Sequence, residues 1–144
     1  MANTETPTAL SAADLAEIRA LFLRQAAGET AHDLGVIESV LAQAGEGQPD
    51  PVNFVARAYC FWGRAAVLEH FREVFTQVWR FEPDPNALKI IPLGRDAAHI
   101  FAPTQITVGR SEDEATVHAF LVNEIAIRTP AGWRISAIVP VPVK

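Results

Sequence analysis

Prolines and turn residues in the second half of the chain limit what that half can fold into. Proline stands at positions 83, 85, 92 and 103, and a proline inside a helix removes a hydrogen bond and clashes with the preceding turn. Apolar runs rich in β-branched residues occupy residues 88–93, 98–108, 115–128 and 133–143. Residues 110–113 and 129–132 separate the last three runs with turn-forming residues. The pattern predicts consecutive antiparallel hairpins.

The first half has helical periodicity instead. Ser11 and Asp14 are typical of a helix start, and apolar residues then recur every three or four positions to about Thr30. Asp33 predicts the start of a second helix, which residues 45–49 end with two glycines and a proline. A third helix is expected after Gly63, with an apolar stripe reaching residue 78, and residues 52–59 are expected to form a short strand. The expected fold class is therefore α+β.

Composition and charge indicate one soluble domain. The chain has 144 residues, of which 49% are hydrophobic, enough for a single core. We expect residues 1–10 to be a flexible N-terminus and residues 11–144 to be the domain. Met1 to Thr8 lacks the pattern of a signal peptide and no apolar run is long enough to span a bilayer, so a cytoplasmic location without membrane contact is expected.

The net charge of -5 and the scattered basic residues argue against a nucleic-acid partner. The single cysteine, Cys60, excludes an intramolecular disulfide and a multi-cysteine metal site, and we interpret it as a small packing residue. No phosphate-cradling or dinucleotide motif is found, and neither a cofactor nor a metal is predicted.

The run at residues 115–128 is apolar on both of its alternating faces. Val117, Leu121 and Ile125 fall on one face, and Phe120 and Val122 fall on the other. A strand with one face in water normally alternates apolar and polar residues. Since helices can cover only one face, we expect a second copy of the chain to cover the other, giving a homodimer through the outer face of the sheet.

The order of these segments resembles a known family. Ile18–Arg24, His32-Asp33-Leu34, Trp62–Val67 and Ala131–Ile135 together resemble the SnoaL-like branch of the nuclear-transport-factor-2-like (NTF2-like) superfamily. The resemblance implies a cone in which a curved antiparallel sheet wraps one long and two shorter helices around an internal pocket. Members of this superfamily include isomerases, dehydratases, cyclases and proteins that only bind or assemble, so the fold alone selects no chemistry.

The resemblance also implies positions for a catalytic site. In the steroid-isomerase branch a carboxylate moves a proton, while a tyrosine and a protonated acid hold the oxyanion, an arrangement that is a standard example of pKa tuning. The matching positions here are Phe54 for the base, Gln25 for the tyrosine and Glu124 for the acid. Phenylalanine cannot accept a proton, so the expected base is missing.

Glu124 is the candidate catalytic residue because it lies in an apolar strand. A pocket position would raise its pKa, which suits acid or base chemistry. The alternatives are an ion pair with a residue such as Arg134, or a place at the dimer seam. Substitution of Glu124 by Gln, followed in ligand binding and stability, separates these roles.

Other candidate ligand-binding residues are mostly aromatic. They are Gln25, Phe54, Tyr59, Phe71, Trp79 and His99. Tyr59 and Trp79 carry a polar atom that needs a partner, and His99 could approach Glu124 from a neighbouring strand. His70 is expected to face solvent, and His32 is expected to make a local contact at the corner between the first two helices.

The sequence therefore predicts a protein that binds a small hydrophobic molecule, or isomerises it by proton transfer. The alternative is a protein-assembly or accessory module that uses the sheet surface. Whether the protein is an enzyme stays open at this level.

Overall fold

The computed structural model describes residues 9–144. Its helices are α1 (Ala12–Thr30), α2 (Leu34–Val40) and α3 (Arg64–Val74), with a short 3-10 turn at Glu112–Glu114. Its strands are β1 (Asn53–Val55), β2 (Cys60–Trp62), β3 (Val78–Pro83), β4 (Lys89–Pro92), β5 (Ala97–Gly109), β6 (Thr116–Thr129) and β7 (Gly132–Pro142). The α+β fold class is confirmed.

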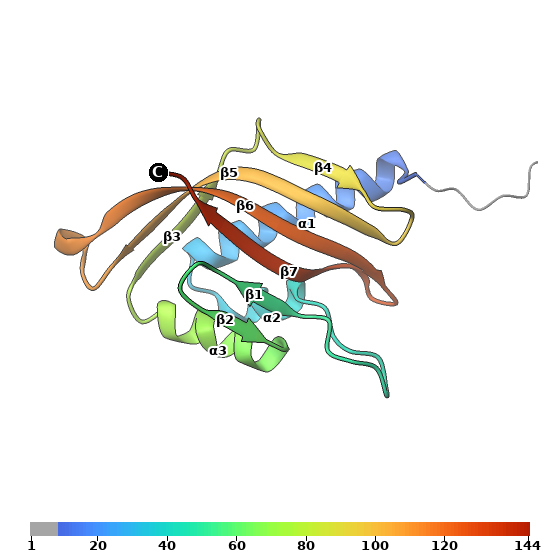
Figure 1. Ribbon diagram of the computed structural model, residues 1–144, viewed down its shortest axis with the longest axis horizontal. Helices are drawn as coiled ribbons and strands as arrows, with labels where there is room; N and C mark the ends of the chain where they lie inside the picture. Colours follow the sequence, from blue (N-terminus) through green and yellow to red (C-terminus); the bar gives the residue numbers. More distant parts are fainter. Residues whose placement is uncertain (1–8) are drawn as a thin grey trace, which may run out of the picture.

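One seven-stranded sheet runs through the molecule in the order β2-β1-β7-β6-β5-β3. Strand β4 also pairs with β5, so β3 and β4 follow one another along the same edge of β5. All pairings are antiparallel except β1 with β7, which is parallel and joins Asn53 and Phe54 to Ala137 and Ile138. Figure 1 shows the long, curved β5 and β6 that form the middle of the sheet.

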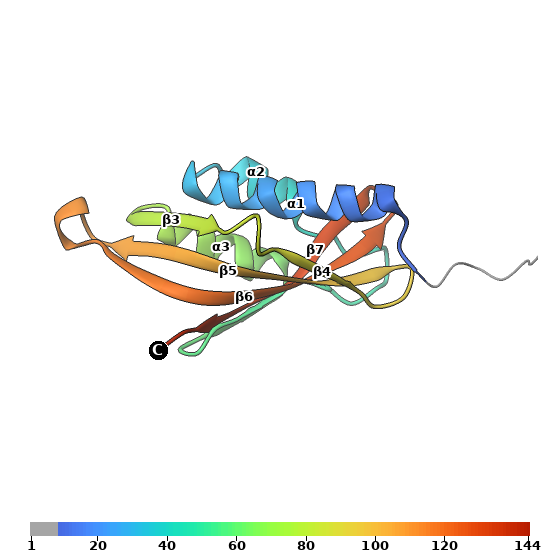
Figure 2. The same cartoon turned by 90° about the horizontal axis from the view of Figure 1, so that it is seen from above.

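Helix α1 lies along one face of the sheet, with α2 beside it (Figure 2). Ser11 and Asp14 form a reciprocal capping box at its start, as their spacing predicts. Leu10, at the end of the segment expected to be flexible, is buried against the core, and residues 1–8 of that segment lie outside the described residues.

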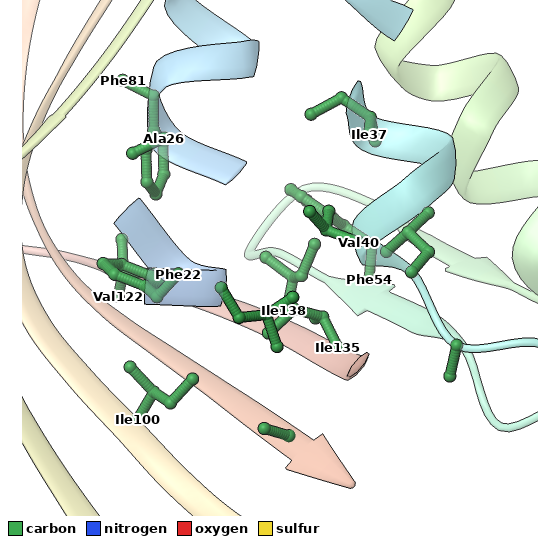
Figure 3. Close-up of a cluster of buried hydrophobic side chains, with 14 of the residues drawn as sticks. Phe22, Ala26, Ile37, Val40, Phe54, Phe81, Ile100, Val122, Ile135 and Ile138 are labelled. Carbon is green, nitrogen blue, oxygen red and sulfur yellow. The ribbon is translucent and has the colours of Figure 1, made fainter. Parts of the chain in front are cut away.

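The core lies between α1 and the inner face of the sheet. Buried side chains labelled in Figure 3 come from α1, α2 and five strands: Phe22, Ala26, Ile37, Val40, Phe54, Phe81, Ile100, Val122, Ile135 and Ile138. The inner-face residues alternate along β5 and β6 because successive side chains of a strand point to opposite faces.

Several predicted boundaries differ from the structure. The run at residues 52–59 is not one strand, because its backbone turns after Val55 to form a hairpin of β1 and β2. Helix α3 ends at Val74, whereas the apolar stripe predicted a helix to residue 78. Val78 begins β3, and its helical spacing from Val74 led to the wrong prediction. Helix α2 ends at Val40, where Leu41 leaves the helix and bridges to Ile135 of β7.

None of the helices in residues 9–144 is both long enough and apolar enough to cross a membrane. This agrees with the absence of a long apolar run in the sequence.

Candidate functional site

Two buried carboxyl groups and one amide form the centre of the candidate site. Gln25 and Glu29 are four residues apart on α1, so their side chains lie on the same face of the helix. Glu124 comes from the middle of β6, where it pairs with Ile100 on one side and Ile138 on the other. Gln25 is 0% exposed, and both glutamates are 1% exposed. The helix therefore places its polar residues directly over the acid in the sheet.

The amide of Gln25 joins the two acids. Its Nε2 donates to Oε2 of Glu29 at 2.8 Å and to Oε2 of Glu124 at 2.9 Å. A side-chain NH2 group has two hydrogens, so one hydrogen serves each acid. Trp79 of β3 adds a third donor, from Nε1 to Oε1 of Glu29 at 3.0 Å. Glu29 thus receives two hydrogen bonds and Glu124 receives one.

Because Glu29 accepts one more hydrogen bond than Glu124, Glu29 is the acid that ionises more easily. Burial raises the pKa of Glu29 to about 7, against the lowering effect of its bonds to Gln25 and Trp79. Burial raises the pKa of Glu124 well above its usual range, and repulsion from Glu29 adds to the effect. At neutral pH the pair therefore holds at most one negative charge, which resides on Glu29, while Glu124 is protonated.

Two oxygens at this centre find no partner among residues 9–144. They are Oε1 of Gln25 and Oε1 of Glu124. A protonated Glu124 can place its hydrogen on the unpartnered oxygen, since its other oxygen already accepts from Gln25. The arrangement is consistent with a neutral Glu124.

A cavity of about 270 Å³ opens beside Glu29. Glu29 and Trp79 lie at its buried side, which we call the floor, and the β1–β2 loop (residues 56–59) lies at its exposed side, which we call the rim. The remaining lining residues are predominantly apolar: Phe54, Phe81, Ile106, Val108, Phe120, Ile138, Pro140 and Pro142, with His118. A pocket with apolar walls and a few polar groups is typical of small-molecule sites.

The structure brings three predicted ligand-binding residues to this pocket. Phe54, Tyr59 and Trp79 line it, and Tyr59 remains 43% exposed at the rim. Phe71 is fully buried and packs edge-on against Phe54 at 6.1 Å between ring centroids, so it supports the wall. Gln25 does not line the cavity, but it donates a hydrogen bond to Glu29, which does.

His99 is separated from the pocket by the sheet itself. Its neighbours Ala98 and Ile100 face the core, so His99 points to the outer face. There its Nε2 lies 2.9 Å from Oδ1 of Asn123. The approach to Glu124 that the sequence suggested does not occur, because Glu124 faces inward.

Arg134 is not a partner of Glu124. It pairs with Ile127 in the β6–β7 register, and its Nη1 donates to the carbonyl of Trp133. Glu124 instead contacts Gln25, a partner that the sequence analysis placed in the same site only through the family resemblance.

His70 was expected to face solvent, and this prediction is wrong. It is 5% exposed, and its ring lies among the rings of Phe54, Phe61 and Tyr59 at centroid distances of 4.7 to 5.2 Å. The β1–β2 hairpin folds over this face of α3 and buries the residue. Cys60, interpreted as a packing residue, is exposed on the same hairpin.

His32 makes the corner contact that was expected. It adopts a positive φ of 56°, and its Nε2 lies 2.9 Å from the carbonyl oxygen of Trp79. Its ring also stacks on Phe75 at 4.9 Å. The residue ties the corner between α1 and α2 to the start of β3.

Sequence reasoning missed Glu29. The signal was present, since Phe22, Gln25 and Ala26 lie seven, four and three positions before it and place it on the apolar face of α1. A carboxylate on that face is costly without partners, and such residues are candidates for function. Within residues 9–144 no group of three or more His, Cys, Asp and Glu side chains is arranged to hold a metal ion.

Comparison with known proteins identifies the fold. No family model matches the sequence, and no curated protein matches it. Among solved structures, a candidate aromatic ring hydroxylase from Novosphingobium aromaticivorans has a TM-score of 0.78 at 16% identity, covering 93% of this chain and 92% of that one. A candidate dehydratase of the NTF2-like family from Streptomyces avermitilis has a TM-score of 0.74 at 16% identity, covering 91% and 97%.

A third structure, an NTF2-like protein with a cystatin-like fold from Novosphingobium aromaticivorans, has a TM-score of 0.70 at 17% identity, covering 92% of this chain and 83% of that one. At such identities the likeness concerns the fold and not the activity. The chain therefore has the cystatin-like cone fold of NTF2-like proteins.

Proposed function

We propose that this protein is a SnoaL-like member of the NTF2-like proteins that binds a small, largely apolar molecule and moves a proton at Glu29. The observation that carries the proposal is a buried carboxylate on the floor of an apolar pocket, held by Trp79 and Gln25. Two of the similar structures are a candidate dehydratase and a candidate hydroxylase, which accords with small-molecule chemistry in this fold.

Glu29 supplies the base that the family pattern lacks at Phe54. A general base works best when its pKa lies near the operating pH, and that of Glu29 is about 7. Each of its oxygens has two lone pairs, so each can accept from Gln25 or Trp79 and still face a ligand. Glu124 acts as a positioning residue, because it reaches Glu29 only through Gln25.

The proton transfer can be written for a ketone with an acidic C–H bond. The C–H electrons move into the carbonyl group to give an enolate, and the proton passes to the Glu29 carboxylate. Tyr59 lines the same pocket at its rim, and burial raises the pKa of its phenol, so the hydroxyl stays protonated and can donate a hydrogen bond to a polar group of the ligand there. Return of a proton from Glu29 to carbon completes the exchange.

Deuterium exchange tests this proposal without a known substrate. 2-Tetralone, a small apolar ketone, is incubated with the protein in D2O, and deuterium uptake at its α-carbons is followed by NMR. The native protein is expected to exceed the buffer rate, with a rise in rate centred near pD 7. Glu29→Gln is expected to abolish the excess and to keep binding, since the substitution preserves shape.

Glu73→Gln, on an exposed position of α3, is the matched control and should exchange like the native protein. Val108→Trp, which fills the pocket, should abolish both binding and exchange. Bound 2-tetralone that exchanges only at the buffer rate would reduce the proposal to ligand binding. If the protein binds no small apolar molecule, the proposed function is wrong.

The assembly role has its own supporting observation. Large apolar side chains are exposed on the outer face of the sheet, in β4, β6 and β7: Ile91, Val117, Leu121 and Val141. We propose that this face joins two copies of the chain, and that the pocket and the dimer are compatible because they lie on opposite faces.

A further inference from the structure

The rim of the pocket carries a positive charge that the proton-transfer proposal does not use. Arg57 lies in the β1–β2 loop, and it lines the pocket together with Tyr59 and His118. The loop follows Phe54, which pairs with Ile138 of β7, so it runs alongside the end of β7. Pro142, at the end of β7, pairs with Phe120 of β6, and His118 precedes Phe120 by two residues on the same face of β6. Three polar side chains thus border one opening.

Arg57 is available to a ligand. Its side chain is exposed, and it forms no ion pair or hydrogen bond with any of residues 9–144. Glu29 is the one carboxylate among the residues that line the cavity, and it is buried on the floor with Gln25 and Trp79 as partners. The rim therefore favours a negative charge, although the chain as a whole has a net charge of -5.

The walls between the two ends are apolar. Phe81, Val108 and Phe120 come from three strands and leave no second charged contact between the floor and the rim in the described part of the chain. A ligand that fits the apolar walls and pairs with Arg57 at the rim has an apolar body and one anionic group. The anionic group points outward, where the guanidinium of an arginine can bind a carboxylate through two parallel hydrogen bonds.

We propose that the ligand is a small aromatic or alicyclic monocarboxylate, with its carboxylate at Arg57 and its proton-donating carbon at Glu29. This inference rests on the proposed function and names the class of molecule that the same pocket takes. The cavity of about 270 Å³ is slightly smaller than the usual range for small-molecule pockets, roughly 300–1,000 Å³, which favours a body of one or two rings.

A matched pair of probes tests the charge. 2-Naphthylacetate and 2-naphthylacetamide have the same shape and differ in charge, and calorimetric titration at low ionic strength gives the affinity of each. The native protein is expected to prefer the acetate by about fivefold, the scale of an exposed ion pair. The preference should shrink as salt is added, because salt screens exposed charges.

Arg57→Gln is expected to remove the preference and to leave the affinity for the amide unchanged. Arg72→Gln is the control, since Arg72 is an exposed arginine on α3 whose partner is Glu69, and this variant should keep the preference. Circular dichroism of both variants checks that the fold is intact.

The outcomes separate this inference from the proposed function. Equal binding of the two probes to the native protein, or a preference that survives in Arg57→Gln, would overturn the monocarboxylate inference and leave the pocket as a site for neutral molecules. Binding of neither probe, together with no binding of 2-tetralone, would overturn the proposed function itself.

Discussion

The side-chain amide of Gln25 donates a hydrogen bond to each of two buried carboxyl groups, and the geometry of these bonds affects the pKa of both. Gln25 gives one hydrogen to each carboxyl group, and Trp79 gives another to Glu29 alone. The difference of one donor leaves Glu124 as the acid that stays protonated. A buried carboxyl group kept neutral at pH 7 is costly to ionise, so its state is coupled to folding.

The pKa values of this pair predict a loss of stability in alkaline solution. A carboxyl whose pKa is higher in the folded than in the unfolded chain contributes stability that is full below the unfolded pKa, near 4.5, and is lost as pH rises through the folded pKa. Most of the Glu29 contribution is lost between about pH 4.5 and 7, so the further fall in the free energy of unfolding between pH 7 and 9 should come mainly from Glu124, by at most about 1.4 kcal/mol per pH unit.

Glu124→Gln removes one of the two protons, so its stability should fall less over the same range. Urea unfolding at several pH values measures the slope. Glu73→Gln should behave like the native protein. A native protein whose stability is flat from pH 7 to 9, or a variant with the native slope, would contradict the raised pKa of Glu124.

The candidate site was only partly predictable at this scale. Glu124 and Gln25 were found because the resemblance pointed to their positions, and Trp79 because a buried indole needs an acceptor. Glu29 was missed although its spacing from Phe22, Gln25 and Ala26 places it on the apolar face of α1, because a glutamate near a helix end is usually exposed. Its burial depends on where β3 and β6 cross α1, which the sequence pattern does not define.

At the scale of elements, the β1–β2 hairpin determines the rim and one wall of the pocket. Its strands have only three residues each, and it joins the main sheet through two parallel pairs with β7. Aromatic side chains on the hairpin close over His70 of α3, whose Nε2 has no partner within residues 9–144. Burial therefore lowers the pKa of His70 to about 4.

His70 should make the protein sensitive to mild acid. A histidine whose pKa is lower in the folded chain contributes stability that is full above the unfolded pKa, near 6.5, and is lost as pH falls toward about 4. His70→Phe keeps an aromatic ring in place of the imidazole and removes the titration. Relative to this variant, the native protein should lose up to about 1.4 kcal/mol of stability per pH unit between pH 6.5 and 5.

Denaturant unfolding of both proteins at each pH gives this difference. His118→Asn, at an exposed position of β6, is the control and should keep the native acid sensitivity. If the difference between native protein and His70→Phe does not change with pH, His70 is not held neutral by burial.

The long elements were predictable and the short ones were not. The strand-like runs around residues 98–108, 115–128 and 133–143 correspond to β5, β6 and β7, because long runs between turn residues leave few alternatives. The hairpin at residues 53–62 and the strand β3 are short, and tertiary pairing determines them more than local pattern does.

At the scale of the whole molecule, the two faces of the sheet differ in what covers them. Helix α1 and the pocket occupy the inner face, and the outer face exposes apolar side chains of β6 such as Val117 and Leu121, 59% and 38% exposed. Both faces of residues 115–128 read as apolar in the sequence for this reason. What covers the outer face stays a prediction.

A homodimer through the outer face should be broken by one charge. Leu121→Glu places a carboxylate on the apolar outer face, where a dimer would bury it, so the dimer should dissociate to monomer in sedimentation velocity at micromolar concentration. Leu15→Glu, on the exposed side of α1, is the control and should stay dimeric. A monomeric native protein at that concentration would refute the dimer.

Carbon NMR measures directly whether an acid with a pKa near neutrality lies on the floor of the pocket. In protein labelled with ¹³C at the glutamate carboxyl carbons, one resonance should titrate with a midpoint of about 7 and should be absent from Glu29→Gln. In Glu124→Gln the same midpoint should stay near 7, because Glu124 is already neutral when Glu29 titrates and burial alone raises the pKa of Glu29. A midpoint near 4.5 for Glu29, as for an ordinary surface glutamate, would contradict a buried acid that takes up a proton near neutral pH.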